Sequence, residues 1–227
     1  MANKPKKLNI RECKAAGKAL VKAQWRTIWP IFLVYVIGCV LLSVIVGQPK
    51  FSVDPTVIEL VLMWMRLIVV LLCGAWAFGA TVISMKLVAA QPVSIRTLFS
   101  GFRHRYGTIT GLYITNALLI AAWSLLFVIP GIVKAYEYSM STFILAENPD
   151  MGISAARRES MRMTKGHKWQ LFLLNLSFIG WNLLSCLTLG FLNVWLAPYA
   201  MTAGVYAYQS LKDHQSPHGK LTVAHWE

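Results

Sequence analysis

The feature that most constrains this chain is a series of long apolar runs separated by short basic segments. A helix that crosses a bilayer needs about 20 apolar residues, because each residue adds ~1.5 Å across a ~30 Å hydrocarbon core. Five runs reach that length, at residues 25–46, 56–89, 107–129, 168–188 and 191–211. The pattern predicts an all-α protein whose helices cross a membrane.

A weaker run at 131–147 supplies a further span. It has only 17 residues and carries Lys134, Glu137 and several hydroxyl side chains, so we interpret it as a fourth span whose polar face meets other helices. The prediction is then a polytopic bundle of about six transmembrane helices. The run at 56–89 exceeds one crossing and is expected to tilt or to project from the membrane.

The composition excludes most soluble folds. Charged residues make up 14% of the chain and hydrophobic residues 56%, whereas soluble domains have about 25% charged residues. The net charge is +13, but the sequence contains no helix-turn-helix, zinc-finger spacing or RNA-binding aromatic motif. We therefore expect no nucleic-acid partner, and we attribute the positive charge to topology and to lipid attraction.

The distribution of the 22 Lys and Arg residues gives an independent check on topology. With the N-terminus in the cytoplasm and six crossings, nineteen of them lie inside, Lys50 and Lys134 lie outside, and Arg66 lies within a span. Cytoplasmic loops carry such an excess of positive charge. The sequence thus predicts a bacterial cytoplasmic membrane protein with both termini in the cytoplasm.

Neither a signal peptide nor a disulfide framework is expected. The first apolar run begins only near Trp25 and is too long for a cleaved signal, so it is predicted to be a retained span. The cysteines contain no C-x-x-C pair and are expected to remain reduced, small apolar residues. They are Cys13, Cys39, Cys73 and Cys186.

Basic amphipathic stretches precede the apolar runs. In residues 9–24 the cations recur every three or four residues and therefore share one helical face, with Cys13, Gly17 and Val21 on the other. Helices of this kind lie in a membrane interface, where their cations attract anionic headgroups. Topology alone, without a specific lipid site, explains the same charges. The candidate headgroup residues are Arg11, Lys14, Lys18, Lys22, Arg103, Arg105, Arg158, Arg162, Lys165 and Lys168.

The order of basic stretch and helical hairpin occurs three times, in units at about 9–89, 92–147 and 152–211. The last two units align at an offset of 59 residues, which places Arg103 on Arg162 and Gly131 on Gly190. All three units point the same way, unlike the inverted repeats of many transporters. We expect a single integral membrane domain followed by a polar cytoplasmic tail at 212–227.

Polar residues at membrane depth form a second group of candidates. Arg66 stands within the second span, where an unpaired charge is costly, with Glu59 seven residues earlier and Glu137 as another possible partner. Lys134 and Tyr136 accompany Glu137 on the fourth span. This group either lines a transport site or only holds helices together.

Motifs of catalysis and metal binding are missing from the sequence. It contains no G-x-S-x-G, H-E-x-x-H or phosphate-binding glycine loop. His214 and His218 are spaced four apart, but Pro217 interrupts a helix between them. We expect no enzyme activity, no metal and no cofactor.

Several motifs in the C-terminal half resemble an uncharacterised bacterial membrane family, domain-of-unknown-function family 975. The segment Ile129–Met140, the segment Ile144–Asp150 and Lys165-Gly166-His167-Lys168-Trp169 are similar to its signature, as are Leu176–Trp181, Thr188-Leu189-Gly190 and Trp195–Tyr199. Asn193 departs from the apolar stretch expected before the last motif. The resemblance implies a multi-span membrane protein and supplies no catalytic residues.

Two functional hypotheses follow from these features. The first is a non-enzymatic envelope scaffold, accessory or protective factor that binds anionic lipid or partner proteins through its basic helices. The alternative is a small transporter or channel with a polar site around Arg66 and Glu137. A homo-oligomer is compatible with both.

Overall fold

The computed structural model describes residues 9–47, 55–103, 105–188 and 192–215, and every regular element in them is an α-helix. The predicted all-α class is therefore confirmed for this part of the chain. In chain order the helices are α1 (Ile10–Ala23), α2 (Trp25–Gly47), α3 (Pro55–Val88), α4 (Ile95–Leu98), α5 (Ser100–Arg103), α6 (Tyr106–Leu126), α7 (Val128–Tyr138), α8 (Ser141–Glu147), α9 (Ile153–Thr164), α10 (Lys168–Leu187) and α11 (Asn193–Gln215).

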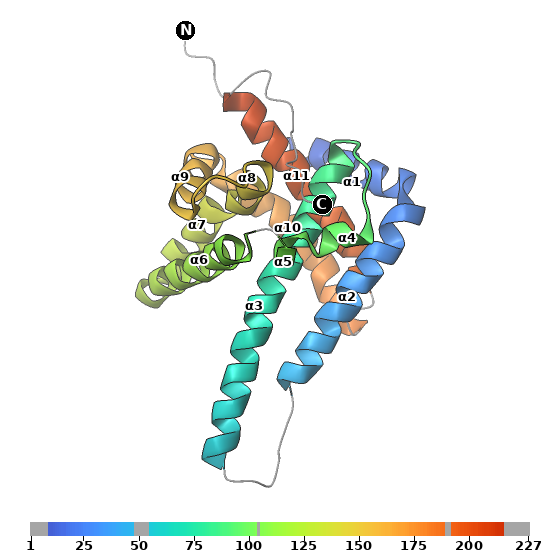
Figure 1. The fold of residues 1–227 in the computed structure, drawn as a ribbon. Coiled ribbons are helices and arrows are strands. Elements are labelled where there is room, and N and C mark those ends of the chain that lie inside the picture. Colours follow the sequence, from blue (N-terminus) through green and yellow to red (C-terminus); the bar gives the residue numbers. More distant parts are fainter. Residues whose placement is uncertain (1–8, 48–54, 104, 189–191, 216–227) are drawn as a thin grey trace.

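Helices α2 and α3 form an antiparallel hairpin whose far half extends beyond all the other helices (Figure 1). The indole of Trp76 donates a hydrogen bond of 3.3 Å to the carbonyl of Tyr35. A Cβ atom at Gly38 would lie 2.8 Å from the Trp76 ring, so a glycine lets the ring lie against the backbone of α2. The prediction that the run at 56–89 tilts in the membrane or projects from it stays a prediction.

Glycines also bring α3 into backbone contact with the two short helices that follow it. A Cβ atom at Gly79 would lie 1.9 Å from the carbonyl oxygen of Leu98, and one at Gly101 would lie 2.3 Å from that of Ala75. No larger residue fits at either position without moving a helix. This packing fixes α4 and α5 against the inner half of α3.

The other helices pack around two buried apolar clusters. One cluster joins α3, α6, α8, α9, α10 and α11 with Cys13 of α1, and the second joins α1 and α2 to α3 and to Leu98 of α4. Helix α1 contacts α11 where a Cβ atom at Gly17 would lie 3.1 Å from the backbone nitrogen of Ala203. The apolar face predicted for residues 9–24 is thus buried against protein at Cys13, Gly17 and Val21.

The segment predicted as a fourth span, 131–147, is not one continuous helix. It is divided between α7 and α8, which are 11 and 7 residues long, with a break at Ser139 and Met140. Hydroxyl side chains compete with helical bonding there, because Ser139 donates to the carbonyl of Tyr136 (2.8 Å) and Ser160 of α9 accepts from the backbone of Met140 (3.2 Å).

The turn between α6 and α7 also differs from the predicted third span, which was expected to continue to residue 129, directly before Pro130-Gly131. Helix α6 ends at Leu126, Phe127 is extended (φ −157°, ψ 137°), and Pro130 lies in the first turn of α7. Proline is tolerated there because the first amide groups of a helix have no intrahelical acceptor. Gly131 closes the hairpin, since a Cβ atom would meet the hydroxyl of Ser124 at 2.0 Å.

Among the described residues, α6 has the length and apolar composition of a membrane crossing, and shorter apolar segments occur at Trp25–Gly38 and Leu72–Val88. The membrane character predicted from sequence thus has support in one helix. The six crossings, the sidedness and the three-unit repeat stay predictions.

Candidate functional site

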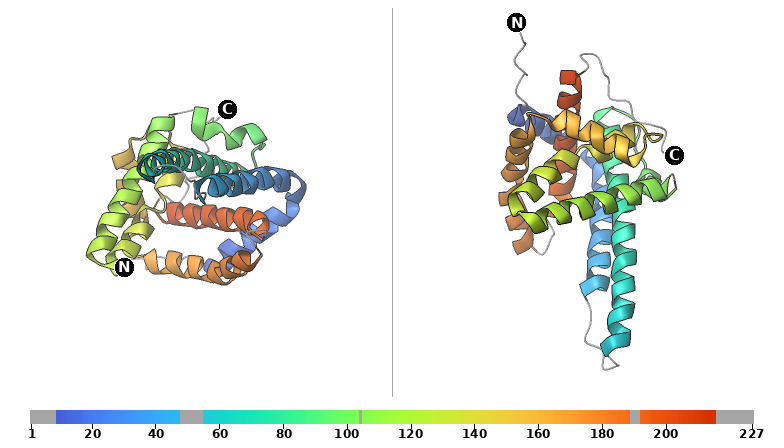
Figure 2. Two further views of the ribbon diagram at one scale, coloured as in Figure 1. Left: turned by 90° about the horizontal axis from the view of Figure 1, so that it is seen from below. Right: turned by 90° about the vertical axis from the view of Figure 1, so that its left-hand side faces the viewer.

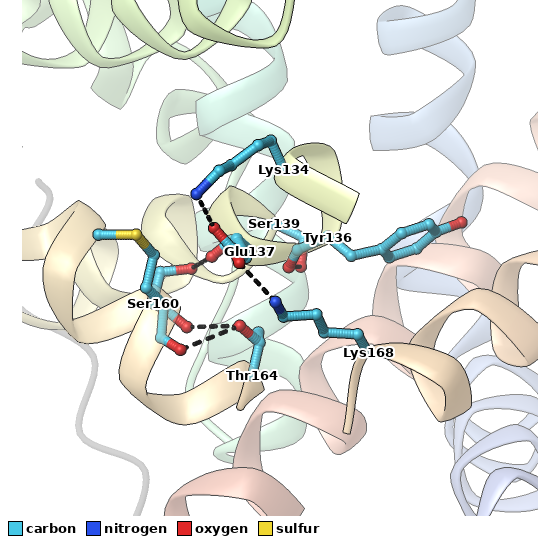
Figure 3. A network of polar contacts seen from close by, with 8 residues as sticks. Lys134, Tyr136, Glu137, Ser139, Ser160, Thr164 and Lys168 are labelled. Carbon is cyan, nitrogen blue, oxygen red and sulfur yellow. Dashed lines mark hydrogen bonds and ion pairs between the residues drawn. The ribbon is translucent and has the colours of Figure 1, made fainter. Parts of the chain in front are cut away.

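The densest polar cluster surrounds the carboxylate of Glu137, near the C-terminal end of α7 (Figure 3). Its Oε2 accepts from the ammonium of Lys134 at 2.6 Å, and its Oε1 accepts from the ammonium of Lys168 at the start of α10. The Glu137 side chain is only 13% exposed. Two charge-assisted bonds offset the cost of burying this carboxylate, and the cluster keeps a net positive charge.

The backbone of the same segment is bound by α9. Ser160 donates a hydrogen bond of 2.6 Å to the carbonyl oxygen of Glu137, and Thr164 donates to the carbonyl of Ser160 at 2.9 Å (Figure 3). Both hydroxyl side chains are fully buried. Helices α7, α9 and α10 are therefore joined at one point.

Aromatic rings surround this cluster. The Lys134 ammonium lies 5.4 Å from the centre of the Trp123 ring, and the Tyr136 ring meets Phe172 edge to face at 6.0 Å. Trp169 stacks on Phe172 and is exposed. Tryptophan, tyrosine and lysine gather in this way at membrane–water interfaces.

The structure brings together three of the four predicted intramembrane candidates, Lys134, Tyr136 and Glu137. The side chains of Arg66 and Glu59 lie outside the described residues, so the proposed pairing of Arg66 with either glutamate stays a prediction. Both carboxylate oxygens of Glu137 already bind lysines. Its observed role is to join α7 to α10.

Helix α1 displays most of its predicted cationic face. Arg11, Lys18 and Lys22 are exposed, whereas Lys14 is half-buried with its ammonium 5.0 Å from the centre of the Phe178 ring of α10. The opposite face holds Cys13, where burial raises the pKa of the thiol above its usual value, with a smaller contribution from Glu12. Cys13 and Cys73 are free thiols.

Helix α9 is amphipathic in the same way, with one buried face and one exposed basic face. Arg158, Arg162 and Lys165 are exposed, while Ala156, Ser160 and Met163 are buried. Glu159 forms two hydrogen bonds with Arg162, at 2.9 and 2.6 Å, which raise the pKa of that guanidinium. Arg158 and Lys165 form no ion pair within the described residues.

The remaining headgroup candidates differ in their surroundings. Lys168 belongs to the Glu137 cluster. Arg105 donates to the carbonyl of Pro149 and lies 3.4 Å from the carboxylate of Asp150. The side chain of Arg103 lies outside the described residues, as do those of His214, His218 and His225. The described residues hold no group of three His, Cys, Asp or Glu that would suit a metal.

Two polar contacts were not predicted. Arg157, counted only as a topological charge, donates to Thr115 at 2.6 Å and to Asn116 at 3.0 Å, both on α6. Glu147 of α8 is buried and accepts from the hydroxyl of Tyr208 at 2.6 Å and from Lys212. The sequence marked Arg157 only as a basic residue, because its partners on α6 are about 41 residues away, and it marked Glu147 only as part of the segment Ile144–Asp150.

Comparison with known families agrees with the motifs of the C-terminal half. Residues 108–215 match the model of the family described as "Protein of unknown function (DUF975)", a segment that includes nearly all of α6 and all of α7 to α11. No curated protein and no solved structure matches the chain. The family carries no stated activity, so function is argued from the geometry.

Proposed function

We propose that this chain is a non-enzymatic protein of the bacterial cytoplasmic membrane, an envelope scaffold, accessory or protective factor that binds anionic lipid headgroups. The observation that carries the proposal is that α1 and α9 are amphipathic, each with one buried face and one exposed basic face. Each helix buries its small and apolar residues against other helices and exposes three cations, Arg11, Lys18 and Lys22 on one and Arg158, Arg162 and Lys165 on the other.

Each Lys or Arg near an anionic membrane surface contributes about 1 kcal/mol to attraction. Glu12 and Glu159 offset part of this charge on α1 and α9, so each helix retains a net positive face. The two helices lie at the same end of the molecule, opposite the far end of the α2/α3 hairpin (Figure 1). One membrane surface would therefore contact both.

The cytoplasmic side is the expected place for these helices, because positive charge collects there. An even number of crossings, including the six predicted from sequence, puts both termini on that side. Partner proteins of opposite charge are the alternative ligands of the same surfaces.

Native mass spectrometry of the gently solubilised protein tests the proposal. We expect the wild type to retain anionic lipid and the Arg158→Gln/Arg162→Gln/Lys165→Gln variant to lose most of it. Lysine at positions 158 and 162 should preserve retention, because the charge remains. A charge-matched control, Lys4→Gln/Lys6→Gln/Lys7→Gln, removes three cations outside α9, and an equal loss in this control would refute a role for the helix.

The transport hypothesis has less support from the described structure. Glu137 is occupied by two lysines, and nothing is described of the Arg66 side chain. Substrate flux in proteoliposomes that disappears in Arg66→Leu would favour transport over the scaffold role.

A further inference from the structure

The three long hairpins extend unequally beyond the cationic helices. From Ile28, packed beneath α1, helix α2 continues 19 residues to Gly47, which is ~29 Å. From Glu137, bound to Lys168, helix α7 leads back nine residues to its start at Val128, which is ~14 Å. From its contact with α1 at Ala203, helix α11 leads back ten residues to its start at Asn193, ~15 Å away.

Tryptophan and positively charged residues lie near the positions from which these lengths are counted. Trp123 lies beneath Lys134, and the exposed Trp169 follows Lys168 in sequence. Across the molecule, Trp25 stacks on Trp195 at 3.7 Å, next to the exposed Arg26, so the start of α11 lies beside the start of α2. Such belts mark the boundary between hydrocarbon and water.

The tips of these hairpins are apolar and uncovered by the rest of the described chain. Leu125, Phe127 and Ile129 at the α6/α7 tip are 87%, 70% and 75% exposed, and Leu183 near the end of α10 is 64% exposed. Exposed apolar side chains of this kind suit lipid acyl chains. The ~14–15 Å counted along α7 and α11 is too short for a crossing, whereas the ~29 Å of α2 equals the whole hydrocarbon core.

We propose, on the basis of the membrane location argued above, that only the α2/α3 hairpin crosses the bilayer. The α6/α7 and α10/α11 hairpins do not cross; they stay at the cytoplasmic boundary, where their apolar tips contact the acyl chains of the cytoplasmic leaflet. Lys134 then lies on the cytoplasmic side together with Lys168, because both lysines bind the carboxylate of Glu137. The balance of Lys and Arg becomes twenty inside against two, Lys50 and Arg66, outside or near the outer surface, which agrees with the positive-inside rule.

The contact of α9 with α6 supports the same topology. Arg157 binds Thr115 and Asn116 in the middle of α6, and its neighbour Arg158 is exposed. If α6 crossed the bilayer, these contacts would hold the cations of α9 at the depth of the hydrocarbon, where charge is costly. Figure 2 shows that α6, α7 and α9 run across the direction of α2 and α3 in the right-hand view.

The proposal also relocates Arg66. Its backbone lies 17 residues along α3 from Ile83, which belongs to the same buried cluster as Ile28, so ~26 Å separate it from the cytoplasmic boundary. Arg66 is then near the outer surface rather than at the midplane. Long cations at that depth reach the headgroups.

Labelling of native lysines tests this topology without substitutions. A membrane-impermeant amine-reactive ester is applied to right-side-out and to inverted vesicles, and modified peptides are identified by mass spectrometry. We expect Lys50 to react only in right-side-out vesicles, and Lys18, Lys165 and Lys134 only in inverted ones. Modification of Lys134 from the outside would overturn the proposal.

Because Lys134 is partly shielded by Glu137, a Phe127→Cys variant with the native cysteines replaced by alanine gives a second measurement. Its thiol should not react with an impermeant maleimide from the outside, whereas a Ser52→Cys control in the α2–α3 loop should. Reaction of Cys at 127 from the outside means that α6 crosses. Release of the wild type by alkaline carbonate would instead refute the membrane location itself.

Discussion

The Glu137 carboxylate offers the sharpest test of what holds α7 to α10. Glu137→Gln keeps the shape of the side chain and removes the charge, which leaves the ammonium groups of Lys134 and Lys168 facing a neutral amide. Breaking a fully buried ion pair costs about 3–5 kcal/mol, and an exposed pair contributes about 0–1 kcal/mol. Here the two lysines are 25% and 34% exposed, so we expect a loss of about 2 kcal/mol after allowing for solvent screening.

For a chain of this size that loss corresponds to a fall of ~4–8 °C in the melting temperature. Thermal unfolding of the detergent-solubilised protein, followed by far-ultraviolet circular dichroism, measures it. Glu159→Gln is the matched control, because it removes a carboxylate from the more exposed pair with Arg162, and a change of about 0.5 kcal/mol or less is expected. If both variants melt at the same temperature, the Glu137 cluster does not stabilise the helix packing.

Three further predictions address packing, polar contacts and reactivity. Gly79→Ala should destabilise the fold by about 1–3 kcal/mol, because its methyl group meets the carbonyl of Leu98, whereas Gly107→Ala, in open space, should be close to neutral; melting temperatures decide between them. Arg157→Met should cost about 1–3 kcal/mol by leaving Asn116 and Thr115 without their charged donor, and an unchanged denaturant midpoint would contradict that role. Cys13 should react with maleimide more slowly than a free thiol at neutral pH, because burial raises its pKa and lowers the thiolate fraction; a rate equal to that of the unfolded chain would refute its burial.

The sequence was informative where a pattern depends on one helix and much less so where it depends on contact between helices. The amphipathic face of α1 followed from the three-to-four spacing of its cations, and the single long helix α3 followed from the apolar run at 56–89. The break between α7 and α8 was missed, because Ser160 of α9 supplies part of its hydrogen bonding from 20 residues away. The bond from Lys168 to Glu137 was missed for the same reason, since Lys168 comes from another helix.

The contacts of Glu137 lie within the segment that matches the family, residues 108–215. Two of the motifs that carry the resemblance, Ile129–Met140 and Lys165–Trp169, lie about 30 residues apart and meet at one carboxylate, since the first contains Glu137 and the second Lys168. The segment between them includes α9, whose Ser160 binds the backbone of Glu137 from the opposite side. A catalytic centre would need a reactive group open to substrate, whereas this carboxylate is largely buried and bound at both oxygens. The two motifs therefore join α7 to α10 beside α9, and the membrane-surface role that we propose would depend on this contact. Loss of lipid retention in Glu137→Gln, with Arg158, Arg162 and Lys165 intact, would show that the orientation of α9 matters as well as its charge.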